Sequence, residues 1–178
     1  GRSKPGLKAQ HVTGLRLACQ VSGGGQLTGD QINSVEISYQ SSPPPTTTVT
    51  ATTTADTQSE RHLTGDIGTA GSICLLLQAA LPCALLGCIA PCQLILKGGT
   101  NATMAPQYDY WERVFWPTLR DQCGLDLDQV QATIIRRGYF PKGGGEVHVR
   151  TQPCRRPLLP IQLTERGDVC EIRIRAFY

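Results

Sequence analysis

Positive charge and glycine are concentrated in the segment 136–147, RRGYFPKGGGEV, of this 178-residue chain. Arg136, Arg137 and Lys142 stand beside the glycine run 143–145, which allows positive φ and a close approach of the backbone to a ligand or to a neighbouring strand. A plain glycine-rich connection with solvated charges would have the same composition. The segment is therefore a candidate binding element that needs support from the rest of the chain.

Strand patterns flank this segment and a second candidate. Ala132–Ile135 is rich in β-branched residues, and Glu146–Arg150 alternates polar and apolar residues with period two. Gln93–Leu96 is a short apolar strand that delivers Lys97–Asn101 to its carboxyl end. Ligands gather at such ends in open α/β layers. Both candidates are thus predicted at strand termini.

Apolar spacing predicts three helices. The first spans Val12–Val21 and ends at the glycines 23–25, the second begins near Ile73, and the third runs from Tyr108 to Gly124 with a kink at Pro117. The residues expected to share a face are Val12, Leu15, Ala18 and Cys19 in the first helix, and Trp111, Phe115, Leu119 and Cys123 in the third. The aromatic stripe of the third helix is interpreted as core.

Two further strands and a loop complete the chain. Ser34–Tyr39 alternates and is expected to cover Val35, Ile37 and Tyr39, and Glu171–Phe177 is expected to place Ile172, Ile174 and Ala176 on one side. The Pro/Thr-rich segment 41–54 is predicted to be a flexible loop. The middle of the chain then reads as a βαβαββ unit. The predicted fold class is α/β, with a four-stranded sheet and two helices on one face.

Composition limits the function classes without selecting one. Seventeen basic against fourteen acidic side chains give a charge of only +3, so an anionic partner is permitted and not required. The eight cysteines form no CxxC pair and are interpreted as reduced thiols, which predicts an intracellular protein and no zinc site. The apolar run Ile73–Ile89 contains Gln78 and Pro82 and is interpreted as a buried helix, so no membrane association is expected.

The segment 136–147 resembles the signature of the RNA 3′-terminal phosphate cyclase family. Three further stretches resemble the family in the same order, namely Lys4–His11, Thr69–Gln78 and Lys97–Gln107. On this resemblance the fold consists of repeated βαβαββ units. Residues 1–40 would be the second half of the first unit, 41–67 a loop with an atypical insertion at Ser59–Ile67, 68–153 the second unit, and 154–178 a linker with the first strand of the third. The chain would be a fragment shortened at both ends.

The resemblance implies an ATP-dependent enzyme with ligase-type chemistry. It would convert an RNA 3′-phosphate to a 2′,3′-cyclic phosphate through a histidine adenylate, with Mg or Mn as the divalent metal and RNA 3′-ends as partners. None of His11, His62 and His148 matches the family's nucleophile, so no catalytic residue is expected in this chain, and the fragment alone is expected to be inactive. A nuclear and possibly also cytoplasmic location is implied.

The site residues implied by the resemblance fall into three groups. Gln78 and Pro106 would contact the nucleotide, with Pro106 against the adenine. Arg2 and Gln10 would line the phosphate or RNA-end side. Weaker candidates, for which a solvated or structural role is equally open, are Lys97, Asn101, Arg137 and Lys142.

Two other functions stay open. One is a non-catalytic, cyclase-like factor of ribosome assembly and rRNA processing with the same fold. The other is an RNA-binding α/β module that uses its basic loops electrostatically. From the residues alone, a Gln78 satisfied within the core is also more probable than one that contacts a ligand.

Overall fold

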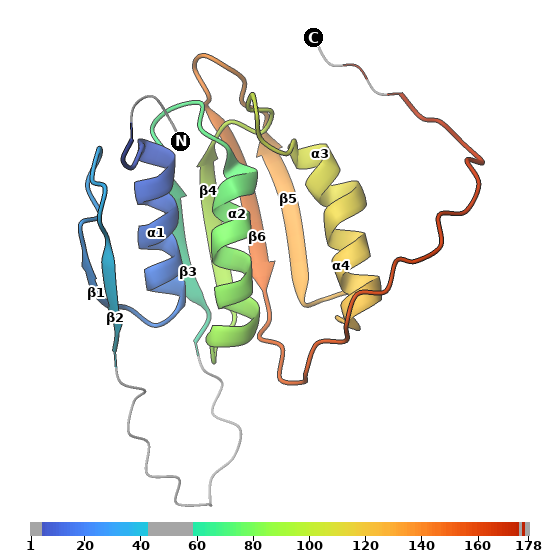
Figure 1. The fold of residues 1–178 in the computed structure, drawn as a ribbon, viewed down its shortest axis with the longest axis horizontal. Coiled ribbons are helices and arrows are strands. Elements are labelled where there is room, and N and C mark those ends of the chain that lie inside the picture. The colour runs from blue at the N-terminus through green and yellow to red at the C-terminus, as the bar shows by residue number, and fades with distance from the viewer. Residues whose placement is uncertain (1–4, 43–58, 175, 177–178) are drawn as a thin grey trace, which may run out of the picture.

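The computed structural model describes residues 5–42, 59–174 and 176 of the chain. Two π-helical turns, Cys83–Gly87 and Trp111–Phe115, extend or connect the regular helices. The described elements, shown in Figure 1, are α1 (Ala9–Val21), β1 (Gly25–Thr28), β2 (Ser38–Ser41), β3 (Arg61–Asp66), α2 (Ile73–Pro82), β4 (Cys92–Gly98), α3 (Tyr108–Tyr110), α4 (Trp116–Cys123), β5 (Val130–Arg136) and β6 (Gly145–Thr151).

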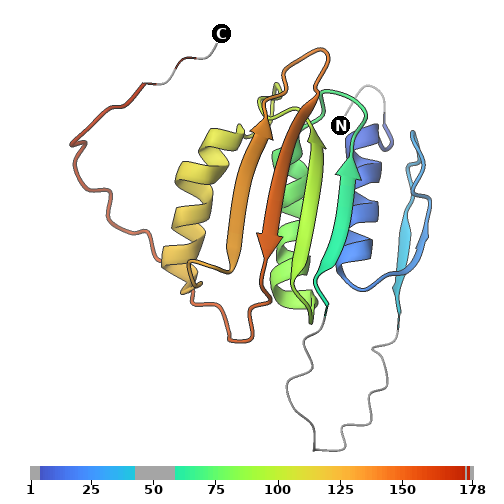
Figure 2. The same ribbon diagram turned by 180° about the vertical axis from the view of Figure 1, so that it is seen from behind.

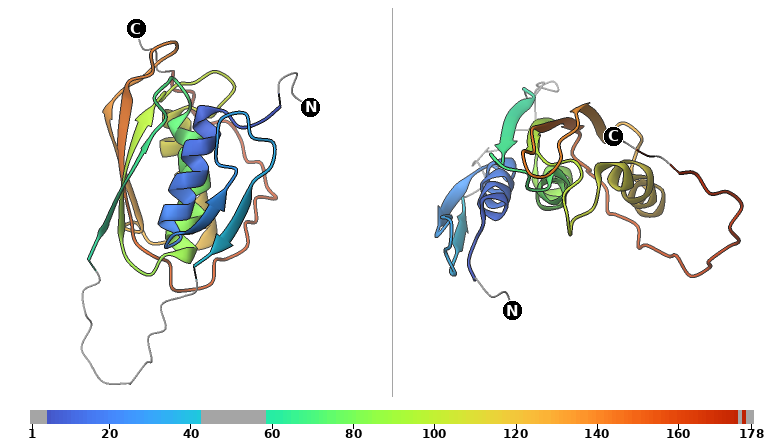
Figure 3. Two further views of the ribbon diagram at one scale, coloured as in Figure 1. Left: turned by 90° about the vertical axis from the view of Figure 1, so that its left-hand side faces the viewer. Right: turned by 90° about the horizontal axis from the view of Figure 1, so that it is seen from above.

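The main sheet has four strands in the order β3-β4-β6-β5. β3 is parallel to β4, and the other two pairs are antiparallel. The succession β3, α2, β4, α3–α4, β5, β6 is a βαβαββ unit, which confirms the predicted α/β fold class. Helices α1, α2 and α4 cover one face of the sheet, and the opposite face is open (Figures 2 and 3). β1 and β2 form a separate antiparallel pair beside α1.

Alternation along the central strands creates the core. Leu94 and Leu96 of β4 and Val147 and Val149 of β6 are fully buried against the helices, while the residues between them face the open side. Each buried aliphatic side chain of this kind contributes about 1.5–3 kcal/mol to stability. The two-residue period that predicted these strands therefore also sets which face of the sheet carries the helices.

The predicted second helix is confirmed as α2. The Ser72 side chain caps it by accepting a hydrogen bond from the backbone N–H of Leu75 (3.4 Å). Within the described residues, none of the helices combines the length and the hydrophobicity that crossing a bilayer requires. The segment that resembles a membrane span is a core helix followed by a π-helical turn.

The predicted third helix is present but not uniform. Pro117 lies at the start of α4, directly after the π-helical turn Trp111–Phe115, because a proline that lacks an N–H is tolerated in a first helical turn. Gly124 ends α4 with a left-handed φ of 70°, as predicted. Trp111 and Trp116 are buried and stacked with ring centroids 6.4 Å apart. The interpretation of the aromatic stripe as core is confirmed.

The segment Ser59–Ile67 was expected to be an atypical insertion within a loop, and the structure shows that most of it is not a loop. Arg61–Asp66 is β3, an edge strand that pairs with β4 over six residues. Its sequence, RHLTGD, is polar, and the strand forms because Leu63 faces the core and β4 provides the hydrogen-bonding partner. The four-stranded unit thus begins at β3 rather than at residue 68. Residues 43–58, which include most of the predicted flexible loop, lie outside the described residues.

Two predicted strands need correction. Only residues 38–41 of the N-terminal alternating segment form a strand, and Val35, Ile37 and Tyr39 are exposed rather than covered. The predicted strand from Glu171 is absent from the described part of the chain, and Ile172 and Ile174 are exposed there. In both cases the alternation is real, but the described residues provide no sheet face against which it could pack.

The predicted face of the first helix is also partly wrong. The buried residues of α1 are Val12, Gly14, Leu17 and Val21, whereas Leu15, Ala18 and Cys19 are half-buried. Gly14 faces α2, where the side chains of Leu76 and Ala79 lie at the ordinary contact distances of 3.6 and 3.9 Å from the position that a Cβ would take. The glycine was not counted as part of an apolar face, although it lies at the centre of the helix contact.

All eight cysteines are free thiols, as predicted. Cys88 and Cys92 lie with their Sγ atoms 3.3 Å apart, and Arg61 Nη1 lies 3.7 Å from Cys88 Sγ. Cys74 is only 2% exposed. Burial, helped by the charge of Asp109, raises the pKa of the Cys74 thiol from 9.0 to about 12.

The Cys74 thiol predicts a dependence of stability on pH. Its folded-state pKa lies above the unfolded value, so its contribution to stability is full below about pH 9 and is lost as the pH rises towards about 12. We expect Cys74→Ala to reduce the loss of unfolding free energy above pH 9 by up to ~1.4 kcal/mol per pH unit. Urea unfolding at a series of pH values measures this slope. The control is Cys170→Ala, which changes an exposed thiol; an unaltered slope in Cys74→Ala would contradict the assignment.

Candidate functional site

Loops from distant parts of the sequence meet at the end of the sheet where β3 and β4 terminate (Figure 1). Gly99 N donates to Gly71 O (2.7 Å), and Thr100 N donates to Gly138 O (2.9 Å). Gln10 Oε1 accepts a hydrogen bond from the backbone N–H of Ser72 (2.6 Å). The four stretches singled out in the sequence are thus in contact at one end of the molecule.

Gln78 and Pro106 line one cavity of about 270 Å³, although they are 28 positions apart in the chain. The other walls are Cys74 and the aromatic side chains Tyr110, Trp111 and Phe115. Gln78 is exposed at this cavity, so its interpretation as a glutamine satisfied within the core is wrong. An aromatic cavity that ends at an amide offers stacking surface and hydrogen-bonding groups to a planar heterocycle.

A buried donor in the same wall lacks a hydrogen bond. Trp111 is 4% exposed, and its Nε1 is buried with no hydrogen-bond partner in the described part of the chain. Unpaired buried N–H groups are costly, but this one has almost no accessible surface and is not shown to face the cavity. The groups that the cavity offers to a ligand are therefore the aromatic rings and the exposed Gln78 amide, which fit a planar aromatic ring. The sequence interpretation missed this role of Trp111 and Tyr110, because helical spacing identifies an apolar stripe but not the part of it that borders a cavity.

Gln10 lines a second cavity of about 580 Å³ on the other side of the loop Ala102–Ala105. Lys8 and His11 contribute from the start of α1, and Thr69–Gly71 contribute from the segment that precedes α2. The amino terminus of α2 lies here, and helix amino termini favour anions. Gln10 also has a structural contact, since its Oε1 holds the N–H of Ser72. Arg2, predicted for the same side, lies outside the described residues.

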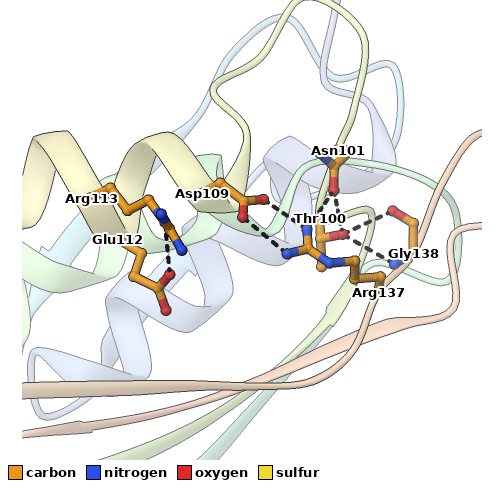
Figure 4. Close-up of polar contacts among 7 residues, drawn as sticks. All are labelled: Thr100, Asn101, Asp109, Glu112, Arg113, Arg137 and Gly138. Atoms are coloured by element: carbon orange, nitrogen blue, oxygen red, sulfur yellow. Dashed lines mark hydrogen bonds and ion pairs between the residues drawn. The ribbon is translucent and has the colours of Figure 1, made fainter. Parts of the chain in front are cut away.

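Arg137 and Asn101 belong to a network that joins β5, α3 and the loop after β4 (Figure 4). Arg137 donates to both carboxylate oxygens of Asp109, at 2.7 and 3.0 Å, and its Nη1 lies 3.5 Å from Asn101 Oδ1. The hydrogen bond to Asp109 raises the pKa of the Arg137 guanidinium. Thr100 Oγ1 adds a contact to Asn101 Oδ1 (2.8 Å). These two candidates therefore have defined contacts that stabilise the loops around the site.

Lys97 and Lys142 lie elsewhere, on the open side of the sheet. Together with Arg136 they line a third cavity of about 250 Å³ that includes Gly144. This cavity shares Thr69 with the cavity of Lys8 and Gln10, so the two lie on either side of the loop before α2. The remaining weak candidates thus form a separate basic group.

The three histidines do not converge. His11 Nδ1 accepts from the backbone N–H of Lys8 (2.9 Å), within the first turn of α1. His62 is exposed on β3, in the segment that was expected to be an insertion. His148 Nε2 lies 2.7 Å from Glu146 Oε1 on the open face of the sheet. The Glu146 partner of His148 was not predicted, although residues i and i+2 of a strand share a face.

Within the described residues, no group of three or more His, Cys, Asp or Glu side chains is arranged to hold a metal ion. Nucleotide phosphates supply ligands to Mg²⁺ in many enzymes, so a metal that arrives with a nucleotide needs no all-protein cage. Of the three cavities above, the one with Lys97, Arg136 and Lys142 includes a single carboxylate, Asp66, and the other two include none.

Fold and site together define a βαβαββ protein with a base-sized aromatic cavity next to a polar loop cluster. A family model described as RNA 3′-terminal phosphate cyclase matches residues 1–171. The chain therefore belongs to the RNA 3′-terminal phosphate cyclase family, as its resemblance indicated.

Individual relatives agree with the family model. The chain is 36% identical to a protein from Dictyostelium discoideum named "Probable RNA 3'-terminal phosphate cyclase", over 99% of this chain and 37% of that protein. It is 36% identical to an RNA 3'-terminal phosphate cyclase of Pseudomonas fluorescens, over 93% of this chain and 42% of the relative. It is 33% identical to an RNA 3'-terminal phosphate cyclase of Desulfurococcus amylolyticus, over 98% of this chain and 43% of the relative. The chain thus spans about two fifths of the length of these relatives.

Proposed function

We propose that this chain forms part of an ATP-dependent RNA 3′-terminal phosphate cyclase, with the adenine of ATP in the cavity of Gln78 and Pro106. The observation that carries the proposal is that these two residues, chosen by family resemblance, line one aromatic cavity. The names of the relatives favour a cyclase over the factor of ribosome assembly.

In this proposal the chain's residues bind and orient the nucleotide. Pro106 and the aromatic walls pack against the base, and Gln78 hydrogen-bonds its edge. ATP, when bound, supplies the adenylyl group that activates the RNA 3′-phosphate for attack by the 2′-hydroxyl. Lys8 and the amino terminus of α2 stabilise negative charge on the phosphate side. Gln10 fixes that terminus through its hydrogen bond to Ser72 N.

The proposed reaction also needs a nucleophilic histidine and a divalent metal, and neither is assigned to the site residues described above. His11 and His148 each have a contact with a neighbouring residue, and His62 faces solvent on the edge strand. We therefore propose that the nucleophile belongs to a segment this sequence does not contain, and that Mg or Mn is bound through ATP phosphates. An intracellular location fits the eight free thiols, while a nuclear one stays a prediction.

Gln78→Ala is expected to weaken ATP use by about fivefold to tenfold, the equivalent of one hydrogen bond, without lowering the melting temperature. The side chain is exposed, so folding does not depend on its burial. The measurement is adenylation by α-phosphate-labelled ATP in the polypeptide that contains the nucleophile, at limiting and saturating ATP. Gln20→Ala is the matched control, because Gln20 is also an exposed glutamine on a helix. Equal adenylation by all three proteins would refute the nucleotide assignment.

The 178-residue chain alone is expected to form no covalent adenylate. Placing an imidazole in line with the α-phosphate contributes roughly 7–11 kcal/mol to such a step. His62 and His148 line neither the cavity of Gln78 nor that of Gln10, and His11, which lines the latter, uses its Nδ1 to accept from the Lys8 backbone N–H (2.9 Å). The purified chain would be incubated with labelled ATP and a divalent metal and examined for an acid-labile label. Stoichiometric labelling that His11→Ala or His148→Ala abolishes would show that the nucleophile lies within this chain.

A further inference from the structure

A basic hollow lies on the open side of the sheet, apart from the cavity that holds Gln78 and Pro106. We define it by Lys97, Arg136 and Lys142 together with Asp66, Gly68 and Gly144, and its volume is about 250 Å³. Lys97 is the penultimate residue of β4, Arg136 ends β5, and Lys142 belongs to the connection between β5 and β6. Three cations from three segments thus surround one small space.

The charged side chains of the hollow differ in the hydrogen bonds and ion pairs that they make. Lys97 and Lys142 have no hydrogen bond or ion pair with other residues that the structure describes, whereas Arg136 donates from Nε to Gly144 O (2.7 Å). Asp66, the carboxylate of the hollow, accepts from the backbone N–H of Gly68 (2.8 Å). Glu146 lies beside it in the cross-strand row Asp66–Lys97–Glu146–Arg136, but its carboxylate contacts His148 Nε2 (2.7 Å). The hydrogen bond to His148, together with the charges of Lys97 and Arg136, lowers the pKa of the Glu146 carboxyl, so part of this positive charge is balanced. The three cations still outnumber the two carboxylates, and Lys142 lies outside the row.

The backbone leaves the hollow open to a ligand. Gly68 and Gly144 have left-handed φ values of 70° and 73°, and no heavy atom lies within 4 Å of the position of a Cβ at either residue. The residues that line the hollow include no aromatic side chain. Such a site recognises a phosphate group by charge and offers no stacking surface to a base.

The position of the hollow relates it to the proposed active site. Thr69 borders both the basic hollow and the cavity of Lys8 and Gln10. An RNA strand whose 3′-terminal phosphate lies in that cavity can therefore continue around the loop Gly68–Gly71 to the open face of the sheet. We propose that the basic hollow binds a phosphodiester of the RNA strand upstream of its 3′ end, independently of base sequence. This inference rests on the proposed function, because it takes the 3′ end to lie beside Gln10.

The test compares ligands of different length. Lys97→Gln with Lys142→Gln would be introduced together, and binding of a single-stranded RNA oligonucleotide with a 3′-phosphate would be followed by fluorescence anisotropy at several salt concentrations. We expect about a tenfold loss of affinity, and a slope of log K against log salt that is smaller by about 1.4, since each contact to a single strand contributes roughly 0.7. A ribonucleoside 3′-phosphate, which has no upstream phosphodiester, should bind the variant and the parent equally.

The matched control is Arg113→Gln with Arg166→Gln, which removes two charges from exposed positions outside the hollow. Unchanged oligonucleotide affinity in the lysine variant, or an equal loss in the control, would overturn the inference. An equal loss for the ribonucleoside 3′-phosphate or for ATP would also overturn it, because the hollow would then bind free phosphate or nucleotide. Failure of the proposed function is distinguishable, since it would appear as absent adenylation in the unaltered complete enzyme.

Discussion

Replacement of Gly138 by alanine is expected to lower the free energy of unfolding by at least ~3 kcal/mol, the upper range for overpacking. A Cβ at this position would overlap the backbone nitrogen of Gly145 and the carbonyl oxygen of Gly98. Both are backbone atoms of paired strands, so neither can move aside as the end of a side chain can. Gly138 also exchanges hydrogen bonds with Thr100, which is fully buried. The substitution therefore disturbs the junction of β4, β5 and β6.

Gly87→Ala is the control for this effect. No heavy atom lies within 4 Å of a Cβ at Gly87, and its backbone does not require a left-handed conformation. Chemical denaturation of both variants gives the comparison, with little change expected for Gly87→Ala. If Gly138→Ala unfolds at the same denaturant concentration as the unaltered chain, the close contact of the three strands described here is incorrect.

The second large effect is expected for Arg137→Met, which should cost about 2 kcal/mol of stability. The substitution removes both hydrogen bonds to Asp109 and leaves that carboxylate, whose side chain is 17% exposed, without its guanidinium. A double-mutant cycle with Asp109→Asn isolates the coupling between the two side chains. We expect most of the loss to appear as coupling energy.

The same view of the structure contains a control pair (Figure 4). Arg113 and Glu112 are 3.8 Å apart and are exposed by 50% and 43%. Exposed pairs contribute about 0.2–1 kcal/mol, so Arg113→Met should change stability little. A coupling between Arg137 and Asp109 no larger than that of the control pair would show that the network does not stabilise the loops.

The sequence predicted those elements whose pattern is local. β4, β6 and α2 have unbroken apolar periodicity, and Gly124 has a short-range role as a helix terminator, so all four were predicted correctly. β3 was expected only as an uncertain strand without bounds, because a polar edge strand is determined by its partner β4, 31 positions along the chain at the first pair, rather than by its own residues. The strand expected from Ser34 forms only at residues 38–41, where β1 pairs with it, and the strand expected from Glu171 is absent from the described residues. Alternation does not reveal where a partner exists.

The site residues also divide into those that a local sequence pattern identifies and those that only tertiary contacts bring together. Periodicity identified Gln78 as an isolated polar residue but placed it in the core, and only family resemblance linked it to Pro106. The structure places both at one cavity. The Arg137–Asp109 pair joins residues 28 positions apart, and the basic hollow joins three separate segments, around Asp66, Lys97 and Arg136. No spacing rule connects such residues. Side chains that meet through tertiary contacts are therefore what the sequence alone could not provide.

The contact of α1 with α2 has a consequence for how the chain divides into modules. α1 precedes the βαβαββ unit, yet Leu17 lies fully buried in the same core as Leu76 and Leu96. Gln10 anchors the first turn of α2, and Arg61 of β3 donates to the carbonyls of Gln20 and Val21. The βαβαββ unit seen in the order of elements is consequently not by itself the unit of cooperativity. A shortened chain that begins at β3 would lack the part of the hydrophobic core that α1 supplies, so a module that can be transplanted has to begin with α1.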